Sequence, residues 1–233
     1  MCGRYTLALE HERLLLQYGF TDVDFLYRPR YNIAPMQESP IVAIEDGKRV
    51  MQLMRWGLVP SWAKDETIAS KLINARGETV AEKPSFRTSF KKRRCLVPAT
   101  GYYEWKVLPE SLPTKKLKQP MYFTVKKGEP FSFAGLWDSW ERFDGKRIVT
   151  YTIITTEPND FAVEVHNRMP VILANSKAQQ SWLSDLPLDA ELALLHPAAD
   201  NSLTIYRVSE KLNNPGDDTA DLQEEVGEEW RLF

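Results

Sequence analysis

Hydrophobic and polar positions alternate in several short runs along the chain, and turn residues separate these runs. Alternation with a period of two is typical of β-strands that bury one face. Asp46-Gly47 lies between two runs and predicts a type I′ hairpin turn, because both central residues of that turn need a positive φ. Strands are predicted over residues 41–45, 48–56, 94–99, 101–106, 121–126, 131–140, 147–155 and 203–208, with further turns at Thr100-Gly101, Lys127-Gly128 and Asp144-Gly145.

Helical spacing is confined to short segments. Apolar residues over 8–18 lie roughly on one face of a helix that Gly19 is expected to end. Residues 28–40 are rich in proline and predict a loop. Further short helices are predicted over 85–92, 176–183 and 189–195, with Asn175 or Ser176 capping the second of these and Asp189 the third.

This order of elements predicts one α+β domain, rich in antiparallel strands, with helices at its edges. The many strands and few crossover helices argue against a doubly wound fold. The sequence also has no glycine-rich phosphate loop and no dinucleotide fingerprint.

Charge is unevenly spread over the 233 residues. The net charge of −2 argues at first against a nucleic-acid-binding protein. However, residues 217–229 hold seven acids and no basic residue, and the rest of the chain has 30 basic against 25 acidic residues, a net charge of +5. We therefore expect a solvated acidic tail and a mildly basic body. The acids of the tail are Asp217, Asp218, Asp221, Glu224, Glu225, Glu228 and Glu229.

Two cysteines, Cys2 and Cys95, are too few for a disulfide scaffold. The first residues do not resemble a signal peptide, and no apolar run reaches the ~18 residues of a membrane span. We therefore expect a cytoplasmic protein with free thiols and no membrane association. The two cysteines and three histidines lack the spacing of zinc ligands, so no metal site is predicted.

Cys2 is the most informative candidate for chemistry. Cysteine is small enough for the initiator methionine to be removed, which would place a thiol and a free α-amine on one residue. Such an aminothiol reacts with an aldehyde, first as a Schiff base and then as a five-membered thiazolidine. The thiol alone could instead attack an amide, as in N-terminal-nucleophile hydrolases. The alternative is an incidental cysteine at a frayed end.

Three polar residues lie where strands or turns can direct them inward. Asn74 follows an apolar pair. Glu104 lies between aromatic residues, where desolvation raises a carboxyl pKa and suits it to general acid–base work, although it also fits the solvent face of a strand. Alternation puts Glu104 and Tyr102 on the same face. His166 is a candidate proton shuttle or a structural histidine.

Arginines lie close to each of these candidates in sequence. Arg4, Arg76 and Arg168 together indicate a site that binds phosphates. Trp62 follows a Pro-Ser turn outside any strong periodicity. An exposed tryptophan near arginines can stack on unpaired bases, worth ~1–3 kcal/mol per base.

Six segments, in this order, resemble the SOS-response-associated peptidase (SRAP) family, whose members are also called abasic-site processing proteins. The resemblance extends to about residue 210 and departs from the common pattern at Met36. The segments are MCGRY at 1–5, RYNIAP at 30–35, WGLVPSW at 56–62, INARGET at 73–79, CLVPATGYYEW at 95–105 and HNRMP at 166–170.

The resemblance implies a domain over 1–215, with 216–233 as an acidic tail, and a mixed, mainly antiparallel β barrel-like core with peripheral helices. It implies a monomer without a cofactor that recognises abasic sites in single-stranded DNA. Cys2 would capture the sugar aldehyde as a thiazolidine and so shield the lesion.

The same resemblance implies a role for each site residue. Asn74 would orient the Cys2 amine, Glu104 would move protons, and His166 would open the sugar or reverse the crosslink. The residues expected to hold the DNA are Arg4, Asn32, Pro35, Trp62, Arg76 and Arg168.

Two other functional classes stay open from the sequence. A cysteine peptidase or autoproteolytic hydrolase would use Cys2, Glu104 and His166 on an amide. A non-covalent single-stranded DNA-binding module would use the aromatic residues and arginines alone, with salt-sensitive binding. A lyase acting through the same Schiff base is a variant of the crosslinking function.

Overall fold

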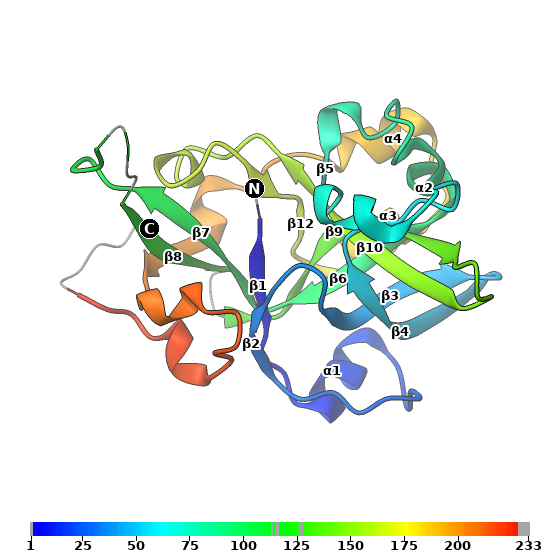
Figure 1. The fold of residues 1–233 in the computed structure, drawn as a ribbon, viewed down its shortest axis with the longest axis horizontal. Helices are drawn as coiled ribbons and strands as arrows, with labels where there is room; N and C mark the ends of the chain where they lie inside the picture. The colour runs from blue at the N-terminus through cyan, green and yellow to red at the C-terminus, as the bar shows by residue number, and fades with distance from the viewer. Residues whose placement is uncertain (1, 113, 115–116, 126–127, 228–233) are drawn as a thin grey trace.

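Two β-sheets pack beside each other in the computed structural model, and the strand that begins the chain lies where they meet (Figure 1). The structure describes residues 2–112, 114, 117–125 and 128–227. The predicted strand end at Lys126, the turn residue Lys127, and the acids Glu228 and Glu229 lie outside the described residues.

Five strands close into a small barrel. All neighbours in it are antiparallel except one pair, because β10 runs parallel to β4 and so closes the ring. The first hairpin is the predicted one: Asp46 and Gly47 have φ of 50° and 73°, as a type I′ turn requires. The barrel strands are β3 (Glu38–Glu45), β4 (Lys48–Trp56), β6 (Arg94–Ala99), β9 (Phe131–Glu141) and β10 (Arg147–Thr156).

A second sheet of five strands, all antiparallel, has the order β13-β8-β7-β1-β2. Gly101 starts β7, and a Cβ there would lie 2.2 Å from the Tyr122 hydroxyl, so only glycine fits this corner. The strands are β1 (Arg4–Leu7), β2 (Arg30–Ile33), β7 (Gly101–Val107), β8 (Lys118–Val125) and β13 (Leu203–Arg207).

Short helices lie at the periphery of the sheets, with α2, α3 and α4 gathered at one end of the barrel (Figure 1). Together with the closed barrel, they confirm the predicted α+β domain with a mixed, mainly antiparallel barrel-like core. The helices are α1 (His11–Tyr18), α2 (Arg87–Lys92), α3 (Ser176–Leu183) and α4 (Leu188–Ala193); the short strands are β5 (Asn74–Arg76), β11 (Met169–Pro170) and β12 (Ile172–Leu173); the 3-10 turns include η1 (Glu66–Lys71), η2 (Gly77–Thr79), η4 (Ala162–Glu164), η5 (Asp200–Ser202), η6 (Glu210–Asn213) and η7 (Ala220–Gln223).

The predicted helix boundaries are correct at some ends and wrong at others. Gly19, with a φ of 71°, ends α1 as expected, but the helix starts at His11 because the amide of Ala8 donates to Thr100 Oγ1. Asn175 caps α3 through its side chain. The prediction that Asp189 caps the last helix is wrong, because Pro187 precedes its first turn and Asp189 lies inside it.

The proline-rich segment contains a strand that the sequence reading assigned to a loop. Residues 30–33 form β2, which pairs with β1 through Tyr5 opposite Ile33 and Leu7 opposite Arg30. Tertiary pairing with the first strand of the chain therefore overrides the local loop signal of the prolines.

The acidic segment packs against the body instead of forming a solvated tail over its described part. The Asp218 carboxylate accepts the backbone N–H groups of Tyr31 and Asn32, at 2.5 and 2.8 Å, and pairs with Arg30. Leu222 is fully buried. Asp218 is therefore held by β2, and the composition of the acidic segment alone does not indicate this contact.

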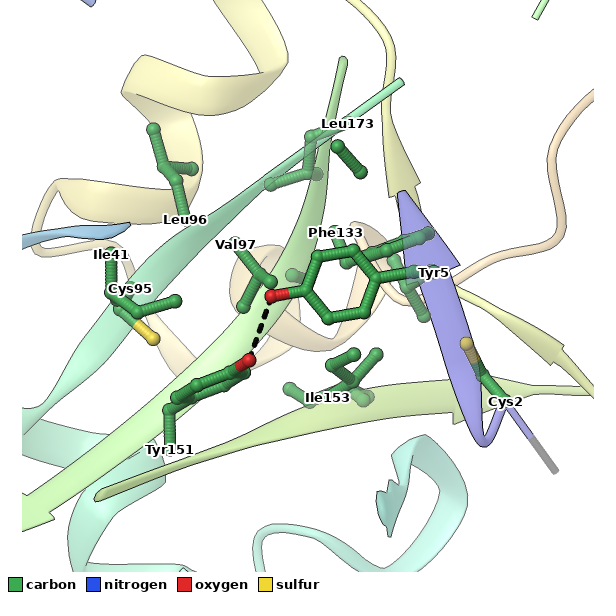
Figure 2. Packing of buried hydrophobic residues seen from close by; sticks show 14 of the residues in the cluster. Cys2, Tyr5, Ile41, Cys95, Leu96, Val97, Phe133, Tyr151, Ile153 and Leu173 are labelled. Carbon is green, nitrogen blue, oxygen red and sulfur yellow. Dashed lines mark hydrogen bonds between the residues drawn. The ribbon is translucent and has the colours of Figure 1, made fainter. Parts of the chain in front are cut away.

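One hydrogen bond in the core joins the two sheets. The hydroxyls of Tyr5 on β1 and Tyr151 on β10 lie 2.7 Å apart and point toward each other (Figure 2). Trp56 packs edge-on against Tyr5 and stacks on Tyr151. These contacts fix β1, and with it Cys2 at its start, against the barrel.

Candidate functional site

Cys2 lies two residues before the start of β1 and is fully buried. In the antiparallel pairing of β1 with β7, Arg4 faces Tyr103 and Tyr5 faces Tyr102, so continuing this register brings Gly3 opposite Glu104. Burial and then the Glu104 carboxylate raise the pKa of the Cys2 thiol well above its ordinary value. At neutral pH the thiol is therefore protonated and needs a base to become a nucleophile.

Glu104 is a carboxyl group whose pKa would allow it to accept the thiol proton near neutral pH. Its side chain is buried, with 2% exposure, and burial raises its pKa from 4.5 to about 7. Tyr102 shares this face of β7, and its pKa is raised by burial, by Cys2 and by Glu104. The predicted alternation is confirmed, because Tyr103 and Trp105 pack in a separate cluster.

Asn74 holds the backbone of Cys2 from the other sheet. It lies on β5, parallel to β10 and opposite Ile153, and its Nδ2 donates to the Cys2 carbonyl at 2.8 Å. Two polar atoms near Cys2, Asn74 Oδ1 and Tyr102 Oη, are buried without a hydrogen-bond partner among the described residues. Buried polar atoms of this kind are rare in folded proteins and are available to a bound group.

His166 follows η4 and is half-buried. Its Nδ1 lies 3.1 Å from the backbone nitrogen of Arg168 and 3.3 Å from the Arg168 carbonyl oxygen, so the backbone of Arg168 holds the ring in place. Burial and then the charge of the N-terminus lower its pKa, so the ring is neutral at pH 7. The charges of the N-terminus and of Lys118 also lower the pKa of Glu104. Glu104 and His166 therefore lie around the start of the chain.

The three arginines have different surroundings. Arg4 donates through Nη1 to Asn32 Oδ1 at 2.7 Å. Arg168 makes a bidentate ion pair with Glu78, at 2.6 and 2.8 Å, and donates to the Thr155 carbonyl at 2.7 Å. Arg76 is exposed. Only Arg76 of the three thus presents an exposed side chain in this structure.

The other three residues expected to hold the DNA also differ in their burial and surroundings. Asn32 is fully buried and hydrogen-bonded to the protein. Pro35 precedes Met36, whose φ of 72° is that of the third residue of a type II turn. Trp62 is 56% exposed and lines an open pocket of about 340 Å³ with Lys64 and Lys71.

The structure thus brings Cys2, Asn74 and Glu104 together and places His166 within range of the N-terminal charge that also acts on Glu104. It spreads the six residues expected at the DNA over several environments. Sequence reasoning missed Tyr102 as a neighbour of Cys2, although the alternation already placed it beside Glu104. It also missed Lys118 and Glu78, for which no local pattern gave a signal.

Over the described residues, no group of three or more His, Cys, Asp or Glu side chains is arranged to hold a metal ion. The same part of the chain contains no helix that is long and apolar enough to cross a membrane.

The barrel and the buried cysteine beside a glutamate define the class of protein. The chain belongs to the SOS response associated peptidase (SRAP) family, whose model matches residues 1–215. The family expected from the six sequence segments is thereby confirmed.

Characterised relatives cover nearly the whole chain. The abasic site processing protein YoqW of Bacillus subtilis (strain 168) is 39% identical over 96% of this chain and 99% of its own. YoaM, an abasic site processing protein of the same organism, is 40% identical over 95% and 97%. The abasic site processing protein HMCES of Xenopus tropicalis is 32% identical over 95% and 77%.

A solved structure has the same fold. The crystal structure of a protein from Bacteroides thetaiotaomicron matches this chain with a TM-score of 0.86 at 28% identity, over 97% of this chain and all of that one. The arrangement of sheets around β1 is therefore shared by a protein of distant sequence.

Proposed function

We propose that this protein processes abasic sites in single-stranded DNA by forming a covalent thiazolidine crosslink through Cys2, once Met1 has been removed. The names of its relatives support processing of abasic sites. One observation carries the chemistry: the Asn74 amide holds the Cys2 carbonyl at 2.8 Å, while the buried Glu104 carboxyl lies beside the same residue.

The reaction joins one aldehyde to one aminothiol and releases one water. The Cys2 amine adds to the aldehyde carbon of the ring-opened sugar, and the resulting carbinolamine loses water to give an imine. The thiol then gives its proton to Glu104, and the sulfur adds to the imine carbon. The ring nitrogen takes up the proton and completes the thiazolidine.

Glu104 suits both directions of this proton transfer. With a pKa of about 7, similar amounts of acid and carboxylate are present at neutral pH. Its action as a base on the thiol therefore increases as the pH rises through about 7. Asn74 Oδ1 and Tyr102 Oη provide an acceptor and a hydroxyl for the polar atoms of the opened sugar.

His166 assists at the sugar itself. Its pKa is lowered, so the ring is neutral at pH 7 and its unprotonated nitrogen is able to accept a proton. We assign it to opening of the sugar ring or to reversal of the crosslink, because both steps move a proton on a sugar oxygen or ring atom.

Contacts with the DNA strand come from residues around this centre. Exposed Arg76 is available to a phosphate, and exposed Trp62 offers a surface on which an unpaired base stacks. We assign Arg4 and Arg168 to the phosphates on either side of the lesion, and the Pro35 turn to the border of the strand.

The test uses single-stranded DNA that carries one abasic site. An intact mass first establishes that Met1 is absent from the purified protein. We expect a heat-stable adduct on a denaturing gel without borohydride, no such adduct from Cys2→Ala, and from Cys2→Ser at most a Schiff base trapped by borohydride. An equally stable adduct from Cys2→Ala would overturn the thiazolidine assignment.

The other functional classes give different results in the same set of assays. Turnover of a peptide panel that Cys2→Ala abolishes indicates a peptidase. Strand cleavage without a lasting adduct indicates a lyase. Salt-sensitive binding that an abasic site does not change indicates a non-covalent DNA-binding module.

A further inference from the structure

Residues 212–218, which we call the clasp, run along the open edge of the sheet that holds β1. The β1–β2 pairing shifts by one residue between Tyr5–Ile33 and Leu7–Arg30, which marks a bulge in β2. Asp218 Oδ1 accepts the two successive N–H groups at this bulge, and Oδ2 pairs with Arg30. A carboxylate thus satisfies backbone donors that the sheet itself leaves unpaired.

Asn32 connects the clasp to Arg4. Its Nδ2 donates to three clasp carbonyls, those of Leu212 at 3.3 Å, Asn214 at 3.1 Å and Asp217 at 2.7 Å. Its Oδ1 accepts from Arg4 Nη1, which also donates to the Leu212 carbonyl at 2.9 Å. Both ends of the amide are therefore used, and the Arg4 guanidinium is fixed from one side.

The clasp also contacts β7 on the face opposite to Glu104. The Trp105 indole N–H donates to Asn213 Oδ1 at 2.8 Å. The Tyr103 hydroxyl donates to the carbonyl of Tyr31 at 2.9 Å, next to the bulge that Asp218 holds. The clasp thus joins β1, β2 and β7.

We propose that Asn32 and Asp218 are positioning residues, which hold Arg4 and the start of β1 so that Arg4 meets a phosphate beside the lesion while Cys2 meets the sugar. This inference rests on the proposed function. It assigns a task to a residue beyond the family model, which ends at residue 215. It also explains why Asn32 is buried, since Asn32 acts on the DNA through Arg4.

The main variant is Asp218→Asn, and Asp221→Asn is its matched control. Both substitutions remove one negative charge, but Asp221 lies outside the clasp and its carboxylate bonds only to Thr219 and Lys211 among the described residues. The measurement is the rate of adduct formation against DNA concentration, at several salt concentrations and at a temperature where melting curves show each variant folded.

Asp218→Asn should raise the half-saturating DNA concentration about 5- to 10-fold, with the saturated rate within about twofold of wild type. The slope of its log affinity against log salt concentration should also fall by about 0.7, which is the value for one lost phosphate contact on a single strand. Asp221→Asn should match wild type. Equal behaviour of the two variants would overturn the proposal.

A double-variant cycle separates positioning from general destabilisation. If Asp218 acts through Arg4, Arg4→Gln/Asp218→Asn should bind no more weakly than Arg4→Gln alone. Full additivity would overturn the proposal. Should Asp218→Asn fail to fold, Asp218→Glu, which keeps the charge and moves it by one methylene, takes its place in the cycle. Absence of any adduct with wild type would instead overturn the proposed function.

Discussion

The two faces of β7 differ in what surrounds them, although their residues alternate along one strand. Tyr102 and Glu104 face Cys2, where burial raises the pKa of both side chains. Tyr103 and Trp105 lie on the opposite face, which we call the outer face, and pack in a cluster with Tyr122 and the C-terminal segment. A period of two therefore separates the residues to which we assign chemistry from those that hold the strand, and single substitutions can address each face alone.

The largest effect is expected on the inner face. Glu104→Gln keeps the size of the side chain but removes the group that accepts the thiol proton. Adduct formation at saturating DNA should slow by ~10²–10⁴-fold, the usual contribution of a general acid–base residue. The loss should be greatest at high pH, where the wild-type carboxylate is fully ionised. A quenched time course from pH 6 to 9 measures it, and a wild-type rate that does not depend on pH across 7 would contradict the base role.

The same variant should change how stability depends on pH. The pKa of Glu104 is about 7 when folded and near 4.5 when unfolded, so the folded state binds its proton more tightly. The free energy of unfolding of the wild type should therefore fall by on the order of 3 kcal/mol as the pH rises from 4.5 to 7, and should stay at the lower value above pH 7. Glu104→Gln lacks this loss. Urea unfolding of both proteins at pH 5 and pH 8 provides the comparison.

On the outer face, substitution should affect stability and leave the chemistry unchanged. Tyr103 is fully buried against Tyr122. Tyr103→Ala should lower the free energy of unfolding by about 3–5 kcal/mol through the cavity it creates. Tyr103→Phe should cost about 1 kcal/mol through the lost hydrogen bond to Tyr31. The saturated rate per folded molecule should stay near wild type, and a Glu104-like loss from Tyr103→Phe would break the comparison.

The smallest effect is expected from Trp105→Phe. This change removes the hydrogen bond to Asn213 at the exposed end of the outer cluster. The free energy of unfolding should fall by about 0.5–1 kcal/mol. Urea unfolding measures this free energy, with Tyr103→Phe as the comparison at a buried position. A saturated rate equal to that of wild type would support the assignment of a purely structural role to the outer face.

Much of the barrel was predictable because its strands carry local signals. Alternation and the Asp46-Gly47 turn located the first hairpin, and the antiparallel neighbours follow from short connections. The strand β2 was not predictable from its own residues, since prolines surround it and its partner is the distant β1. Closure of the ring by the parallel β10–β4 pair is likewise a long-range contact without a local signature.

The candidate site shows the same division. The sequence identified Cys2, Asn74, Glu104 and His166 one at a time, but their meeting depends on the β1–β7 and β5–β10 registers. Residue type alone cannot tell whether an arginine is already paired, and Arg168 proved to be held by Glu78. Asn32 matched the expected segment, yet its surroundings come from residues about 180 positions further along.

The position of β1 between β2 and β7 also sets an order of events during synthesis. The strand is among the first residues made, yet its second neighbour is complete only at Val107. At ~5–20 residues per second, the edge of β1 that pairs with β7 stays open for roughly 5–20 seconds. In that interval the enzymes that trim initiator methionine meet an open chain. The removal of Met1 that we propose would therefore precede burial of Cys2, and the aminothiol would be made before the sheet closes around it.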